Sequence, residues 1–208
     1  MMIETKPTDG GNVPANGDLR FRFDRYLAPE TVNSSDYELK SGDANASFRV
    51  SYDPVDRAVV ILPRLNMRVG LRYSLTIKPG ALTALDGSEL EDEHTIEFRV
   101  TQSEDVLDQT NKVDFERDLK PIIEASCSCH GPEPATFPEL SAETLIGQPS
   151  QRQSGGRLVV PGRPLESYLI QRILPDYPQV RGDMKVLSDT ERRLFVRWVN
   201  ELPSTAQE

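Results

Sequence analysis

Leu19-Arg20-Phe21-Arg22-Phe23 alternates apolar and charged residues at every position. A β-strand directs successive side chains to opposite faces, so this alternation is typical of a strand with one face buried and the other in water. Four more stretches in the first hundred residues have an alternating or continuous apolar pattern that predicts strands, namely residues 48–52, 59–62, 71–77 and 96–100. The first half of the chain therefore reads as a set of short strands.

Turn-forming residues separate these stretches. They include Asp53-Pro54, Lys78-Pro79-Gly80 and Asp86-Gly87, whose side chains favour tight turns. Short strands joined by frequent turns predict an all-β sandwich. No cysteine lies in this part of the chain, so we expect packing alone to hold the sandwich together.

The turns and strands of residues 1–102 also follow an order found in a known family. The order consists of Pro7-Thr8-Asp9-Gly10 before Val13-Pro14, residues 19–24 running into Thr31-Val32, and Tyr73-Ser74-Leu75 leading to Gly80-Ala81-Leu82 and Asp86-Gly87. In these features the segment resembles the bacterial Ig-like domains of surface-layer and other cell-surface proteins. The resemblance implies a spacer or adhesive module outside the cytoplasm.

The net charge of the whole chain excludes some classes of binding partner from those that we expect. The formal net charge is -9, with 33 acidic and 24 basic residues, which argues against nucleic acid and anionic membranes because no basic stripe is evident. No apolar run approaches the roughly 20 residues of a membrane span. Met1 to Gly10 lacks the basic and apolar regions of a signal peptide. If the natural protein is exported, we expect its signal or lipid anchor to have been removed or to lie upstream.

The pattern changes in the second half of the chain. Residues 103–112 are polar and predict an interdomain linker, and residues 113–208 have helical periodicity. Pro121 is expected to kink the first helix or to begin a new one. Ser188 and Glu191 have the spacing of a capping box before the clearest helix. That helix has an apolar face made of Leu194, Phe195, Trp198, Val199 and Leu202.

Both cysteines of the chain lie in Ser126-Cys127-Ser128-Cys129-His130. The motif that attaches a c-type haem is Cys-x-x-Cys-His, in which two thiols form thioethers and the histidine binds iron. Here the motif is one residue short. Residues two apart on a helix point in nearly opposite directions, so a regular helix predicts at most one thioether, through Cys129, with the role of Cys127 open.

Residues 113–208 carry further short motifs around this stretch. These are Phe115, Lys120-Pro121-Ile122-Ile123, Cys129-His130-Gly131-Pro132, Val159-Val160-Pro161-Gly162, Ser167-Tyr168-Leu169, Met184, Leu187-Ser188 and Trp198. In their order the segment resembles a small mono-haem c-type cytochrome domain. The resemblance implies one haem c, with Cys127 and Cys129 as candidate attachment residues and His130 and Met184 as iron ligands. The number of possible iron ligands agrees with this pair, since residues 113–208 contain one histidine and one methionine.

The sequence therefore predicts a two-domain protein, an all-β Ig-like sandwich followed by an all-α cytochrome-c-like domain. Its predicted function is that of an exported, periplasmic or cell-surface cytochrome that passes single electrons to an unidentified redox partner protein and is not an enzyme. The alternative is a haem-free structural or adhesive module with a degenerate cytochrome domain. For Cys127 and Cys129 themselves, a disulfide, inert thiols and a zinc site remain open.

Overall fold

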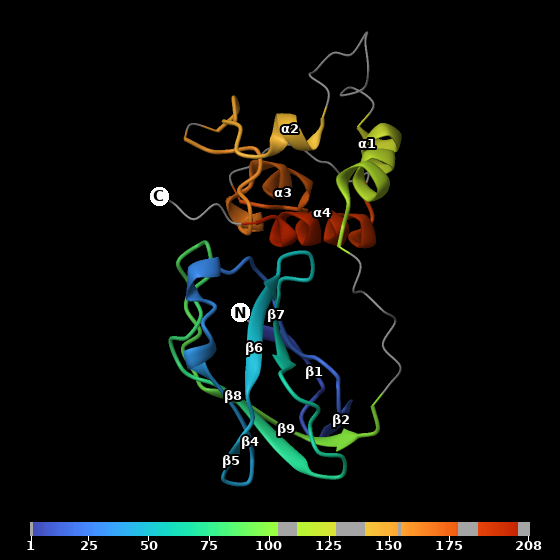
Figure 1. The fold of residues 1–208 in the computed structure, drawn as a ribbon. Helices are drawn as coiled ribbons and strands as arrows, with labels where there is room; N and C mark the ends of the chain where they lie inside the picture. The colour runs from blue at the N-terminus through green and yellow to red at the C-terminus, as the bar shows by residue number, and fades with distance from the viewer. Residues whose placement is uncertain (1, 104–111, 128–139, 154, 179–186, 204–208) are drawn as a thin grey trace. The chain divides into compact units, whose positions relative to one another are not determined.

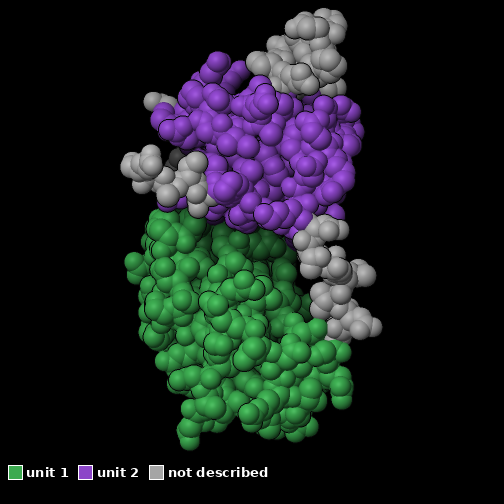
Figure 2. All heavy atoms as spheres, viewed as in Figure 1, with its two compact units in different colours: residues 1–107 green, residues 108–208 purple. Residues whose placement is uncertain are grey.

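The computed structural model describes residues 2–103, 112–127, 140–153, 155–178 and 187–203. The chain divides into two compact units, which we call unit 1 (residues 1–107) and unit 2 (residues 108–208). Figure 2 colours the two units separately. Each unit is described by itself below.

Unit 1 is a β-sandwich of two sheets (Figure 1). The four-stranded sheet has the order β1 (Met2–Lys6), β3 (Leu19–Phe23), β7 (Ala58–Pro63) and β6 (Phe48–Asp53). The five-stranded sheet has the order β2 (Gly11–Pro14), β9 (His94–Thr101), β8 (Arg72–Ile77), β4 (Tyr37–Ser41) and β5 (Ala44–Asn45). Two single-turn 3₁₀ helices, Pro29–Thr31 and Ser34–Asp36, precede β4.

The register of the strands explains the alternation in the sequence. β3 pairs with β7 in antiparallel fashion, with Leu19 opposite Ile61 and Phe21 opposite Val59. All four of these side chains are fully buried. In the other sheet, β8 pairs with β9, with Tyr73 opposite Phe98. The inward faces of both sheets meet in one apolar core, so the predicted β-sandwich is confirmed.

Four strands were not predicted, namely β1, β2, β4 and β5. They are two to five residues long. β2 pairs with β9 in parallel fashion, with Val13 opposite Val100, a partner that lies far away in the sequence. Local patterning gives little signal for such a strand, since the long-range pairing stabilises it.

Unit 2 contains short helices joined by irregular chain. A single π-helical turn, Phe115–Leu119, leads into α1 (Lys120–Ser126), and α2 (Ala142–Leu145), a 3₁₀ turn (Pro164–Glu166) and α3 (Tyr168–Ile173) follow. The longest helix is α4 (Asp189–Glu201). Pro121 occupies the first turn of α1, as expected for a proline that begins a helix.

The capping box of α4 is confirmed. The Ser188 hydroxyl accepts from the Glu191 N–H, and the Glu191 carboxylate accepts from the Ser188 N–H at 2.6 Å. On the inner face of the helix, Phe195, Trp198 and Val199 are buried. The rings of Trp198 and Phe115 lie 5.1 Å apart between centroids, so the predicted apolar face of α4 packs into the core of unit 2.

The prediction of an all-α second domain is wrong. Between α2 and α3 the chain forms β-bridges, with Ile146 beside Val159 and Arg157 beside both Pro149 and Ser167. Among the described residues only α4 exceeds two turns. Prolines and glycines interrupt the helical periodicity, so the backbone of residues 146–167 hydrogen-bonds to itself instead of continuing a helix. Among the described residues, the nine strands of unit 1 make β-structure the larger part of the fold.

Candidate functional site

Of the predicted site residues, the structure describes Cys127 alone. α1 ends at Ser126, and Cys127 is its C-cap residue, half-buried, with its N–H donating to the Ile123 carbonyl at 2.7 Å. Cys129, His130 and Met184 lie outside the described residues. The described residues therefore do not test the predicted ligand set. The structure places Cys127 where the helix has already ended, so the helical geometry considered for the cysteine pair does not apply there.

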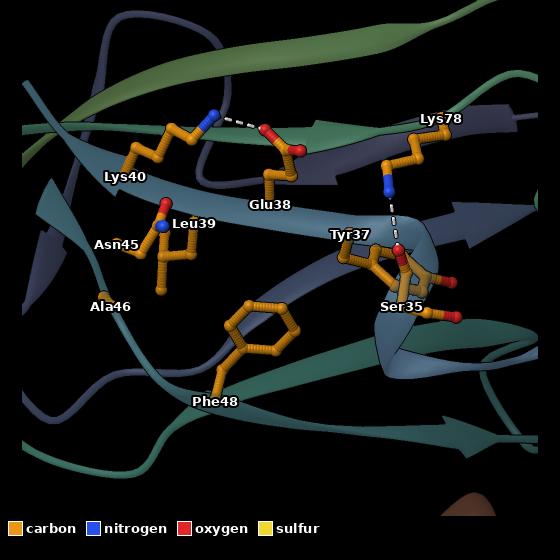
Figure 3. A pocket seen from close by; sticks show the side chains of 9 residues that line it. All are labelled: Ser35, Tyr37, Glu38, Leu39, Lys40, Asn45, Ala46, Phe48 and Lys78. Carbon is orange, nitrogen blue, oxygen red and sulfur yellow. Dashed lines mark hydrogen bonds and ion pairs between the residues drawn. The ribbon is translucent and has the colours of Figure 1, made fainter. Parts of the chain in front are cut away.

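A pocket in unit 1 is a different candidate. It lies at the open edge of the sandwich, where β4 and β5 of one sheet come near β6 of the other, and it encloses about 260 Å³ (Figure 3). Its lining consists of Ser35, Tyr37, Glu38, Leu39, Lys40, Asn45, Ala46, Phe48 and Lys78. β6 is the edge strand of one sheet, and the two-residue β5 is the edge strand of the other and pairs with the end of β4 alone, so this side of the sandwich is open.

The charged groups of this pocket are already partnered. The Lys40 ammonium donates to the Glu38 carboxylate, and the Lys78 ammonium donates to the Ser35 carbonyl at 2.7 Å (Figure 3). The hydrogen bond from Lys40 lowers the pKa of Glu38, and the charges of Lys40 and Lys78 act in the same direction. Glu38 and Lys40 therefore form a surface ion pair that leaves little net charge for a ligand.

The Tyr37 hydroxyl is the polar group that the pocket leaves unsatisfied. Tyr37 is 4% exposed, and its hydroxyl oxygen has no hydrogen-bond partner in the described part of the chain. Burial, with a smaller contribution from Asp36, raises the pKa of Tyr37, so the phenol is a neutral donor at physiological pH. Less than 1 Å² of this oxygen is accessible, so it offers little surface to a group bound in the pocket.

The remaining lining consists of the polar Asn45 and the apolar Leu39, Ala46 and Phe48 (Figure 3). None of the lining residues is a histidine or cysteine. At about 260 Å³ it is also smaller than the pockets that hold most ligands. The arrangement can hold a small group between polar side chains and an apolar wall.

The sequence contained a signal for part of this pocket that the sequence analysis missed. Tyr37-Glu38-Leu39-Lys40 alternates buried and half-exposed residues in β4, which is the pattern of a half-buried strand. Only the tertiary structure shows that β6 approaches this strand from the opposite sheet.

Comparisons with known proteins bear mainly on unit 1. Residues 2–100 match the family model described as "Bacterial Ig-like domain". No curated protein matches the chain.

Solved structures with a similar fold have low identity. A copper resistance protein from Escherichia coli, PcoC in its selenomethionine form, is 14% identical, covers 49% of this chain and 99% of its own, and has a TM-score of 0.39. CopC from Methylosinus trichosporium OB3b is 16% identical over 51% of this chain and 98% of its own, also at 0.39. The S-layer protein rSbsC(31-844) is 13% identical over 46% of this chain and 13% of its own, at 0.36. At TM-scores this low the similarities assign no activity.

The predicted function as a haem-carrying electron-transfer cytochrome is wrong. The family model that matches the chain is an Ig-like one. In the described residues no group of three or more His, Cys, Asp and Glu side chains is arranged to hold a metal ion.

The resemblance to cytochromes depended on short motifs. Where these motifs fall on described residues, they form turns and contacts within unit 2. For example, the Gly162 N–H donates to the Val199 carbonyl at 2.8 Å, which fixes the turn after Pro161 against α4. The comparisons instead place residues 2–100 among the bacterial Ig-like domains.

Proposed function

We propose that the protein is a structural or adhesive module outside the cytoplasm, in which unit 1 acts as a spacer or docking domain. The observation that carries this proposal is the complete two-sheet sandwich of unit 1, with its own continuous core, over the segment that matches the Ig-like family. A domain with its own core keeps its shape when it is joined to other units, which is what a spacer requires.

The proposal also rests on how the described polar groups are used. Arg20 bonds to Asp18, Asp53 and Asp56, and Arg25 bonds to Asp24 and Asp86. These contacts tie neighbouring turns of the sandwich together. Polar groups engaged in such contacts serve shape rather than chemistry, so the proposed module has no substrate chemistry of its own. No helix among the described residues is long and apolar enough to cross a membrane.

Location tests the first half of the proposal. An epitope-tagged full-length chain is expressed in its natural host, intact cells are labelled with an impermeant antibody, and the periplasmic and cytoplasmic fractions are assayed in parallel. We expect the chain at the surface or in the periplasm. Recovery in the cytoplasmic fraction alone would overturn the proposal.

The role of unit 1 as a spacer is tested by whether it folds without unit 2. Residues 1–103, produced alone, are expected to fold with the β-sheet circular dichroism of a sandwich and to unfold cooperatively. A fragment that is unfolded at every urea concentration would contradict a spacer role, because a spacer must not depend on its neighbour.

A further inference from the structure

Exposed apolar side chains gather in one loop of unit 1. Among the described residues the exposed large apolar side chains are Leu62 (39%), Leu65 (79%), Val69 (50%), Leu71 (42%) and Leu85 (39%). Three of them lie between β7 and β8, in residues 64–71, where the chain crosses from one sheet to the other at an end of the sandwich (Figure 1). We call residues 64–71 the crossing loop. Clustering of this kind marks an interaction surface, whereas scattered exposure needs no explanation.

The crossing loop is held in place by its backbone. Met67 is buried in the core, and its N–H donates to the Ala15 carbonyl at 2.8 Å. The Gly70 N–H donates to the Val100 carbonyl at 2.8 Å, and the Val100 N–H donates to the Leu71 carbonyl at 3.0 Å. The loop is therefore anchored to the body of the sandwich while Leu65 and Val69 point outward. Exposure of these side chains belongs to the folded state.

The segment around the loop carries a charge opposite to that of the whole chain. Residues 57–85 contain Arg57, Arg64, Arg68, Arg72 and Lys78 and no aspartate or glutamate. The net charge of -9 hides this local excess, which the sequence analysis therefore missed. At physiological salt, charges act over about 8 Å, so a surface touching the loop would sense the local arginines more than the distant carboxylates.

Three arginines at this end of the sandwich have no carboxylate partner among the described residues. Arg72 and Arg99 lie directly opposite each other on β8 and β9, an arrangement in which like charges repel. In the described part of the chain, the side chains of Arg68, Arg72 and Arg99 form no ion pair, in contrast to Arg20 and Arg25. Their guanidinium groups are available to bind phosphate oxygens, for which the planar fork is well suited.

We propose that the crossing loop docks unit 1 on an anionic phospholipid surface. Leu65 and Val69 enter the interface between headgroups and acyl chains, and Arg68, Arg72 and Arg99 contact lipid phosphates. Apolar side chains flanked by basic residues are the combination that peripheral membrane segments use. A side chain that is 79% exposed protrudes from the surface, and a lipid surface accepts a protruding side chain without the complementary pocket that a protein partner must supply.

Vesicle binding by the full chain tests the proposal. The wild-type protein is sedimented with vesicles of phosphatidylglycerol mixed with phosphatidylcholine, and with vesicles of phosphatidylcholine alone. We expect binding to the anionic vesicles that weakens as salt is added, and little binding to the neutral ones. Absence of binding to the anionic vesicles would overturn the proposal.

Variants locate the contact. Leu65→Ser with Val69→Ser, and separately Arg68→Glu with Arg72→Glu, are each expected to weaken binding by roughly tenfold or more. The matched controls are Leu85→Ser, an exposed leucine outside the loop, and Arg49→Glu, an exposed arginine on β6. Both controls should bind as the wild type does, and circular dichroism should show every variant folded.

Two further outcomes would contradict the assignment. Equal loss of binding in the loop variants and in the controls would mean that the net charge of the chain, rather than the loop, governs the interaction. Sedimentation velocity provides the second outcome. If the wild-type chain dimerises and Leu65→Ser with Val69→Ser abolishes the dimer while leaving vesicle binding unchanged, the loop is a contact between copies of the chain.

Discussion

Unit 1 holds its strands by ladders of backbone hydrogen bonds around one continuous core, whereas unit 2 joins its short helices by apolar packing, single backbone hydrogen bonds and individual side-chain contacts. In unit 2 the contacts include the Phe115 and Trp198 rings and the bonds of the Arg192 guanidinium. The two units are therefore expected to lose stability through different kinds of substitution. Both units depend on a buried apolar core, and unit 2 depends in addition on a few polar groups, of which the buried Arg192 side chain is one. The following variants test that contrast, from the largest expected effect to the smallest.

Phe21→Ala should produce the largest loss of stability. Phe21 is fully buried between β3 and the opposite sheet, and truncating such a ring costs about 3–5 kcal/mol. Urea unfolding of unit 1, followed by far-UV circular dichroism, measures the loss. Trp198, the single tryptophan, lies in unit 2, and its fluorescence transition should not move.

The control for this variant is Leu65→Ala, which removes a side chain that is 79% exposed. It should change the stability by less than about 0.5 kcal/mol. If Phe21→Ala shifts the Trp198 transition by the same amount as the circular dichroism transition, the two units unfold together and the contrast between them fails.

Arg192→Met tests the dependence of unit 2 on polar contacts. The Arg192 side chain is buried, and its Nε donates to the Ile173 carbonyl at 2.9 Å, which ties α4 to the end of α3. Methionine keeps much of the apolar volume and loses the donor. The expected cost is about 1.5–3 kcal/mol, measured by urea unfolding with Trp198 fluorescence.

The same guanidinium also pairs with Asp189 at 2.7 Å, but the Asp189 side chain is 61% exposed. Asp189→Asn should therefore cost less than about 1 kcal/mol. If it costs as much as Arg192→Met, the ion pair at the surface, and not the bond to the buried carbonyl, links the two helices.

Tyr37→Phe should leave unit 1 unchanged or stabilise it by up to about 1 kcal/mol. The variant removes a buried hydroxyl that has no hydrogen-bond partner among the described residues, and removing an unsatisfied polar group avoids its desolvation penalty. Urea unfolding compares the variant with the wild type. A clear loss of stability would show that a bound water or ligand atom satisfies the hydroxyl in the pocket at β4.

The smallest expected effect is a dependence of unit 2 on pH. Hydrogen bonds from the backbone and hydroxyl of Ser188 lower the pKa of Glu191 below its usual 4.5. Because the folded pKa is depressed, this contribution to stability is present above pH 4.5 and is lost as the pH falls through the folded pKa. Glu191→Gln should flatten the pH dependence of the Trp198 transition in that range. An unchanged profile would mean that the capping box contributes no charge-dependent stability.

The sequence predicted some parts of both units well, and the reason is local. In β3, alternating residues face either the core or water, so the pattern of this strand alone shows which of its side chains are buried. Ser188 and Glu191 are three residues apart and form the predicted capping box within one helical turn. Neither feature requires a distant partner.

The wrong predictions came from short motifs that were interpreted without knowledge of their tertiary contacts. The short motifs of residues 113–208 suggested a cytochrome, yet the backbone around Val159 and Gly162 bridges to Ile146 and to Val199 instead. Of the four predicted cofactor residues, the structure describes Cys127 at the end of a helix, while Cys129, His130 and Met184 lie outside the described residues. The order of motifs along the chain was a poor guide to the fold because it carries no information on backbone pairing.

By itself, the sequence determined that residues 1–102 alternate and turn as a sandwich does, and where the last helix begins, because these features depend on neighbours within a few residues. Only the tertiary structure decided that β4 and β6 frame a pocket, that Arg72 faces Arg99, and that the crossing loop is anchored with its leucine and valine side chains outward. Each of these features requires contact between segments that are distant along the chain. Side-chain burial and strand pairing stabilise those contacts, and neither can be read from a short stretch of sequence.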